Sequence, residues 1–99
     1  MKTIHLHSPS CCVRLVSQLA IGTKAKAQAA ETVAIGESAQ ATKQNANAFG
    51  SQAIASGESA LALGSGSNAT ADSAVSIGND ANATAKSSVA IGESTNATG

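Results

Sequence analysis

Larger apolar side chains recur along this chain in pairs two residues apart, and a glycine directly follows each pair. Val33 and Ile35, for example, stand before Gly36. The arrangement returns every fourteen residues, which spaces the glycines evenly at Gly22, Gly36, Gly50, Gly64, Gly78 and Gly92. Such a short and constant period is typical of a repeat array, in which one unit stacks on copies of itself, rather than of a globular domain.

The repeat unit reads S-x-[V/L]-A-[I/L]-G-x-x-A-x-A-x-x-x when it is written from residue 17. Six copies fit, the last one truncated: SQLAIGTKAKAQAA, ETVAIGESAQATKQ, NANAFGSQAIASGE, SALALGSGSNATAD, SAVSIGNDANATAK and SSVAIGESTNATG. Residues 1–16, MKTIHLHSPSCCVRLV, lie outside the pattern. We expect 1–16 to be disordered, or translated from sequence upstream of the true protein, and 17–99 to form the repeat structure.

Each unit contains two stretches with the alternation of a β-strand. The first is the apolar pair, such as Val33 and Ile35, and the second is a pair of alanines, such as Ala39 and Ala41. Gly36 ends the first strand where the backbone turns, and Thr, Ser, Asn, Asp and Lys supply the return loop. The unit therefore predicts one coil of an all-β, flattened parallel β-roll with coils about 4.8 Å apart.

The alternation also predicts which side chains face inward. We expect the larger apolar residues of the first strand to form the core: Leu19, Ile21, Val33, Ile35, Phe49, Leu61, Leu63, Val75, Ile77, Val89 and Ile91. The small residues between them would face outward, as an exposed strip or as an interface between subunits: Ala20, Ala34, Ala48, Ala62, Ser76 and Ala90. On the second strand the outward residues are mostly polar and are the candidate ligand face: Lys26, Gln40, Asn68, Asn82 and Asn96.

Composition favours an oligomer. Phe49 is the only aromatic residue, and alanine, which inflates the apolar fraction, buries little area. Ordering one coil costs on the order of 20 kcal/mol, while the coil hides only two aliphatic side chains and two alanines. A single roll is therefore expected to be marginal, and a homotrimer would bury the alanine strips without leaving an unmatched face.

The segments T-V-A-I-G-E-S at 32–38 and S-V-A-I-G-E-S at 88–94 resemble the head repeat of trimeric autotransporter adhesins, the YadA-like head family. The resemblance covers 17–99, where the period, the S-V-A-I-G core and the following A-x-A occur in register. It implies a left-handed parallel β-roll that assembles as a homotrimer. It further implies display on the bacterial cell surface, at the outer membrane, and binding to host cells or matrix proteins such as collagen, with no enzymatic activity and no cofactor.

The sequence also departs from the family pattern. Ser87 and Glu31 stand where the family usually has Asn, and Asn47 replaces the first apolar residue of the third unit, where a buried amide would need hydrogen-bond partners and could distort its coil. Neck, coiled-coil stalk, membrane anchor and export signal are not recognisable in the chain. We expect it to be a head fragment of a longer adhesin, or the product of a truncated or misassigned gene.

Other functions have little support. The repeat region is slightly acidic and has no basic stripe, which argues against nucleic-acid binding. The spacing of His5, His7, Cys11 and Cys12 matches no usual zinc pattern, so no metal site is expected. No nucleophile with a neighbouring base can be assembled, and a hexapeptide-type acyltransferase would need a period of six. The Asn-Ala-Thr triplets are formal glycosylation acceptors, but in a bacterial roll they are better explained as polar ladders.

Three alternatives remain open from the sequence. A phage tail fibre or another spike could be built from similar rolls, and genomic context would separate it from an adhesin. An ice-binding array would require a stricter Thr-x-Thr rank than this chain has. A disordered low-complexity segment would fit the richness in Ala, Ser, Asn and Gly, but not the strict register of the apolar pairs.

Overall fold

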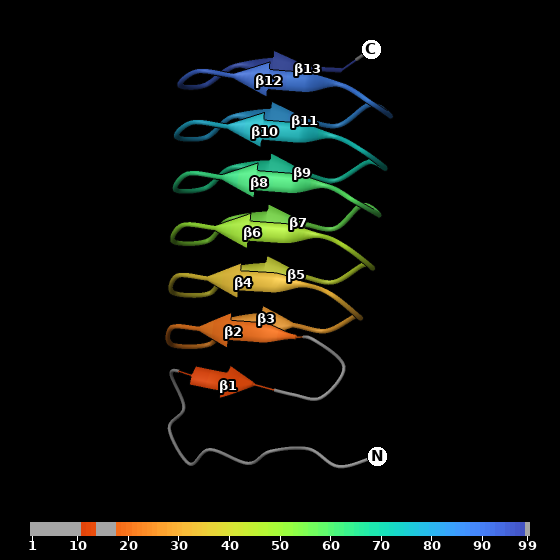
Figure 1. Cartoon of the computed structure of the whole chain (residues 1–99). Coiled ribbons are helices and arrows are strands. Elements are labelled where there is room, and N and C mark those ends of the chain that lie inside the picture. The colour runs from red at the N-terminus through yellow and green to blue at the C-terminus, as the bar shows by residue number, and fades with distance from the viewer. Residues whose placement is uncertain (1–10, 14–17, 99) are drawn as a thin grey trace.

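The computed structural model describes residues 11–13 and 18–98, which form two sheets lying back to back (Figure 1). The first sheet contains β1 (Cys11–Val13), β2 (Leu19–Ile21), β4 (Val33–Ile35), β6 (Asn47–Phe49), β8 (Leu61–Leu63), β10 (Val75–Ile77) and β12 (Val89–Ile91). The second sheet contains β3 (Lys26–Ala27), β5 (Gln40–Ala41), β7 (Ile54–Ala55), β9 (Asn68–Ala69), β11 (Asn82–Ala83) and β13 (Asn96–Ala97).

From β2 onward the chain winds as a parallel solenoid of about six coils. Each strand pairs in parallel with the strand fourteen residues later, so that Ala34 lies beside Ala48 and Gln40 beside Ile54. We number the coils one (19–32), two (33–46), three (47–60), four (61–74), five (75–88) and six (89–98). The predicted all-β parallel roll is therefore confirmed.

Backbone hydrogen bonds join every coil to the next. In the second sheet the amide of Lys26 donates to the carbonyl of Ala39 at 2.8 Å, and at the corner the amide of Gly36 donates to the carbonyl of Ile21 at 2.7 Å. The corner glycines lie directly after the first-sheet strands, with φ between 123° and 128°. A Cβ on Gly50 would lie 2.7 Å from the carbonyl carbon of Gly64, so the corners require glycine for their close stacking as well as for their backbone angle.

The interior between the sheets is lined by alanine, which corrects the predicted core. Ala34, Ala48, Ala62 and Ser76 of the first sheet are fully buried, and Ala90 is 3% exposed. They meet the buried alanines of the opposite wall, such as Ala41 and Ala55. The strip that we expected to face another subunit therefore points inward from coil two to coil six, while Ala20 in coil one is half-buried.

The aliphatic residues expected in the core lie on the outer face of the first sheet instead. They are half-buried or exposed in the single chain: Leu19, Ile21, Val33, Ile35, Phe49, Leu61, Leu63, Val75, Ile77, Val89 and Ile91. The reason is the thickness of the coil. Both walls meet through fully buried alanines, such as Ala34 and Ala41, so the two sheets lie closer together than the roughly 10 Å of sheets that are separated by larger side chains. That gap accepts alanine and serine and excludes leucine and isoleucine.

The hydroxyl groups inside the coils have hydrogen-bond partners. Thr32 Oγ1 donates to the carbonyl of Ala29 at 2.7 Å, and Ser76 Oγ donates to the carbonyl of Ala81 at 2.6 Å. Asn47 is not inside, so the expected distortion of its coil does not occur. It is half-buried on the outer face, and β6 keeps the common register with β4 and β8.

Part of the non-repeat segment belongs to the fold. β1 pairs antiparallel with β2, placing Cys11 beside Ile21 and Val13 beside Leu19. The expectation that 1–16 is disordered is therefore wrong for Cys11–Val13. Positions 1–10 and 14–17 lie outside the described residues, and there the expectation remains a prediction.

Candidate interaction surfaces

The outer face of the first sheet is a continuous apolar surface. Two columns run along it, one residue per coil in each, because in-register parallel strands place equivalent side chains directly above one another. Exposure is 37% for Ile21 and 39% for Leu63, and it rises to 56% for Val89 and 62% for Ile91 at the C-terminal coil. Asn47 is the single polar member of these columns. We call this surface the aliphatic face; contiguous exposed apolar surfaces are typical of interaction sites in general.

The outer face of the second sheet is polar. Its outward residues are the candidate ligand residues of the sequence, together with one apolar side chain: Lys26, Gln40, Ile54, Asn68, Asn82 and Asn96. We call this surface the polar face. Its position on the opposite wall from the aliphatic face follows from the winding of the coil, since each coil contributes one strand to each sheet (Figure 1).

Three asparagines on the polar face form a hydrogen-bonded ladder. Asn68 Nδ2 donates to Asn82 Oδ1 at 2.8 Å, and Asn82 Nδ2 donates to Asn96 Oδ1 at 3.2 Å. The same Nδ2 atoms also reach the turn carbonyls of Gly66 and Asp80, each at 3.2 Å. The amides are therefore held in one orientation along the solenoid, while Asn68 Oδ1 accepts no hydrogen bond from residues 18–98.

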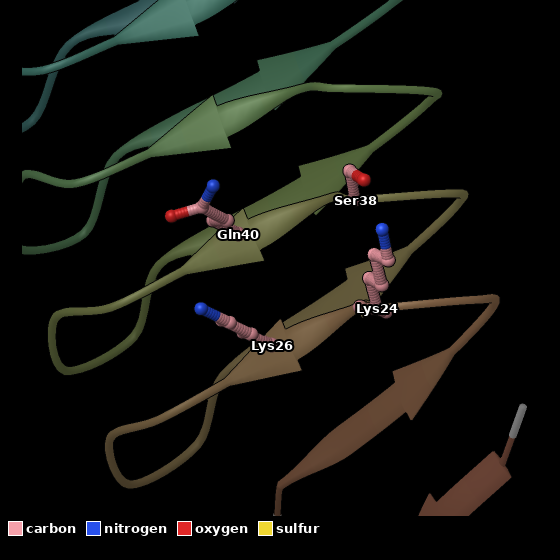
Figure 2. Close-up of a pocket in the computed structure, with 5 residues that line it drawn as sticks. Lys24, Lys26, Ser38 and Gln40 are labelled. Carbon is pink, nitrogen blue, oxygen red and sulfur yellow. The ribbon is translucent and has the colours of Figure 1, made fainter. Parts of the chain in front are cut away.

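A shallow trough runs along the polar face beside the turn that follows each glycine. Figure 2 shows its N-terminal part, where Lys24 and Lys26 of coil one lie below Ser38 and Gln40 of coil two. A second hollow shares Ser38 and Gln40 and continues across the next coils to Asp80, along Gln52, Ile54, Gly66 and Asn68. The trough is therefore cationic at the coil-one end and carries a carboxylate at the coil-five end.

Metal-ligating side chains do not cluster among the described residues. Within 11–13 and 18–98, no three His, Cys, Asp or Glu residues are grouped in a way that could hold a metal ion. Four residues were considered for a zinc site from the sequence. Two of them, Cys11 and Cys12, lie in β1, and the other two, His5 and His7, lie outside the described residues. No helix among the described residues is long and apolar enough to cross a membrane.

The comparison with protein families identifies these repeats. The model of the YadA head domain repeat, which contains two copies, matches overlapping segments at 19–39, 28–53, 41–67, 55–81, 69–95 and 83–99. From the second match on, the starting positions follow the fourteen-residue period to within one residue, as expected when each match advances by one coil. The chain belongs to the YadA head family.

YadA head repeats are adhesin domains of bacterial surface proteins, the trimeric autotransporter adhesins. The predicted YadA-like resemblance is thus confirmed for residues 19–99. Neither a curated protein nor a solved structure matches the chain.

Sequence reasoning placed the polar residues on one outer wall but missed two parts of the surfaces. It assigned the aliphatic columns to the interior, and it did not include the turn residues that border the trough, such as Lys24, Ser38 and Asp80. A usable indication was present in the sequence: each of these turn residues stands two positions before an outward residue of the second sheet.

Proposed function

We propose that this YadA head chain is the non-enzymatic head module of a bacterial surface adhesin. It assembles as a homotrimer and binds host matrix proteins, such as collagen, or host cell surfaces, and it reaches the outer membrane through an anchor supplied by other parts of a longer adhesin. The supporting observation is that a family of adhesin repeats here presents two separate regular surfaces, one apolar and one polar, on opposite walls of one thin solenoid.

The aliphatic face is the surface that we assign to the trimer. Its side chains each contribute about 1.5–3 kcal/mol when they are fully buried, and a single chain leaves Val89 and Ile91 more than half exposed. Burying alanine in the interior stabilises each coil only a little compared with the conformational entropy that is lost when the coil becomes ordered. Three aliphatic faces packed around a common axis would supply a shared core that one chain does not have.

Charges on the aliphatic face should separate the trimer into monomers. We expect Ile35→Lys combined with Ile77→Lys to give a monomeric mass in sedimentation analysis, because two lysines per chain would have to be desolvated in the shared core. The matched control is Gln40→Lys combined with Asn82→Lys, which adds the same charge to the same coils on the polar face. The control should remain trimeric. A trimeric mass for the first variant would show that the aliphatic face is not the interface.

The polar face is the surface that we assign to the ligand. Removing its amides with Asn68→Ala, Asn82→Ala and Asn96→Ala should lower the binding of the protein to immobilised collagen by about tenfold or more, because repeated weak contacts act together through avidity. The trimeric mass should not change. The control carries Gln44→Ala, Asn45→Ala and Asn79→Ala, three amides in turns. Equal loss in both variants would contradict the assignment, and an absence of wild-type binding would exclude collagen as the ligand.

A further inference from the structure

We propose that Asn47 sets the register of the trimer and restricts it to chains that carry an amide in the same coil, a role that rests on the proposed assembly through the aliphatic face. Chains built from nearly identical coils have to be aligned, and their partners have to be selected. Coil three carries the side chains that distinguish it from every other coil of the aliphatic face.

A face built from repeated coils can pair in more than one register. Outside coil three, its first column contains only Val or Leu and its second column only Ile or Leu. If one copy shifts along its neighbour by one coil, about 4.8 Å, aliphatic side chains still meet aliphatic side chains in most coils. Such a shifted contact does not close on itself and leads to open chains of subunits. The aliphatic residues alone therefore discriminate poorly against misaligned assemblies.

Coil three interrupts this uniformity in both columns. Its first-sheet strand, β6, carries Asn47 in the first column and Phe49, the only aromatic side chain of the protein, in the second (Figure 1). Both side chains are half-buried in the single chain, and both keep the common register with β4 and β8. An apolar face thus carries one polar group at a fixed height along the solenoid.

The amide of Asn47 has few hydrogen bonds within its own chain. Its Nδ2 donates to the carbonyl of Asn45 at 3.4 Å, and its Oδ1 accepts no hydrogen bond within residues 18–98. The Nδ2 contact is longer than the roughly 2.7–3.2 Å of a good N–H···O bond. When three aliphatic faces pack together, water is excluded from this amide. It then needs a partner in another copy, because burying an amide without one is unfavourable.

A three-fold axis along the solenoid supplies that partner. The rotation carries each residue to the same height in the next copy, so the three Asn47 amides share one layer. An amide both donates and accepts, and three of them around an axis close a ring in which each Nδ2 donates to the Oδ1 of the next copy. A shift by one coil instead sets Asn47 against Val33 or Leu61 of the neighbour, whose side chains form no hydrogen bonds. A single buried asparagine specifies the register of coiled coils in the same way.

The same layer distinguishes between chains. A head chain with the same repeat but an aliphatic residue at the position of Asn47 would leave the amides of its partners unsatisfied in the shared core. An amide that has lost its partner keeps the full cost of its desolvation. Specificity therefore arises from a penalty on the wrong partner. The function inferred is the sorting of chains, in which closed trimers form from chains whose amides lie in the same coil.

The test moves the amide by one coil without changing the composition. The exchanged chain carries Asn47→Leu and Leu61→Asn, which transfers the amide to coil four. The matched control chain carries Leu61→Val and Val75→Leu, which exchanges two aliphatic residues of the same column. Each full chain, with a tag of distinct mass, is produced in the same cells as the wild type, and native mass spectrometry counts pure and mixed trimers. Circular dichroism checks that the coils are intact.

The exchanged chain alone should form trimers, because matched amides satisfy one another in either coil. Together with the wild type it should give about tenfold fewer mixed trimers than the control chain gives, since a mixed trimer buries unmatched amides in two layers. The control chain should mix with the wild type at random. Equal mixing of the exchanged and control chains, or an exchanged chain that does not form trimers, would overturn the proposal.

Failure of the proposed trimer gives a different result. A monomeric mass for the wild type alone would refute the assembly through the aliphatic face, and the role of Asn47 with it. A trimeric wild type that mixes freely with the exchanged chain would refute the role of Asn47 and leave the trimer in place.

Discussion

Replacing Ala62 by leucine is expected to unfold the central coils of the protein. Ala62 is fully buried between the two sheets, where the walls hold only alanine, serine and threonine side chains. Three additional carbon atoms would force the sheets apart and break the hydrogen bonds to coils three and five. Overpacking of this kind costs about 3 kcal/mol or more, and the thermal unfolding midpoint measured by circular dichroism should fall by about 10 °C or more.

The matched control for this change is Ala62→Ser. Serine already occupies the equivalent position in the next coil, where Ser76 Oγ donates to the carbonyl of Ala81. Ala62→Ser should therefore shift the midpoint by only a few degrees. Unfolding of the serine variant together with an intact leucine variant would place the inside of the coil on the wrong side of the first sheet.

Replacing Gly50 by alanine is expected to be the second strongly destabilising change. The φ of Gly50 is 128°, which alanine rarely adopts, and the added Cβ would lie 2.7 Å from both the carbonyl carbon and the carbonyl oxygen of Gly64. The coil corners would have to separate, which would weaken the hydrogen bond from the Gly64 amide to the Phe49 carbonyl. Backbone strain alone costs about 1–3 kcal/mol, and the lost stacking adds to it.

Two other glycines separate these causes in the same unfolding measurement. Gly92 has nearly the same backbone angle, but a Cβ there would meet only Thr95 Cγ2 at 3.2 Å, so Gly92→Ala should show the strain without the corner clash. Gly66 has a φ of 71°, close to Ser38 at 61°, and a Cβ there would lie 2.5 Å from Asp80 Oδ1, the end of an exposed side chain that can turn away, so Gly66→Ser should cost much less than Gly50→Ala. Equal losses for Gly50→Ala and Gly92→Ala would show that stacking at the corners contributes little.

The repeat pattern predicts most of the architecture because two properties of the chain are strictly periodic. The fourteen-residue spacing of the glycines fixes the coil length, and the alternation of side chains fixes two strands per coil. These features led to the parallel solenoid, to the register and to the inward alanines of the second sheet, such as Ala41 and Ala55.

The alternation alone does not determine which of the two alternating sets of side chains in a strand faces inward. We placed Val33 and Ile35 inside because large apolar residues are usually buried in a single chain. In a coil with two tight turns the space between the walls is smaller than those side chains, so Ala34 takes the inner position. Alanine stands on both strands of every unit except the fifth, where Ser76 takes its place in the first strand. This recurrence indicated a thin interior, since two walls of such small side chains pack only when they lie close together.

The repeat pattern does not predict the trough on the polar face either. It is formed by side chains from two different local structures, the turn residues and the outward strand residues, which become neighbours only once the coils are stacked. Its charge asymmetry depends on single residues, Lys24, Lys26 and Asp80, that differ from coil to coil and therefore do not belong to the repeat.

The direction of the hydrogen bonds between coils has a mechanical consequence. Because the bonds run along the long axis, a force that pulls the two ends of the solenoid apart loads them one coil at a time. Each coil that peels away exchanges a rise of about 4.8 Å for up to about 50 Å of extended chain. Under load each released coil becomes about ten times longer, so the molecule yields gradually where a rigid rod would transmit the whole force to its attachment.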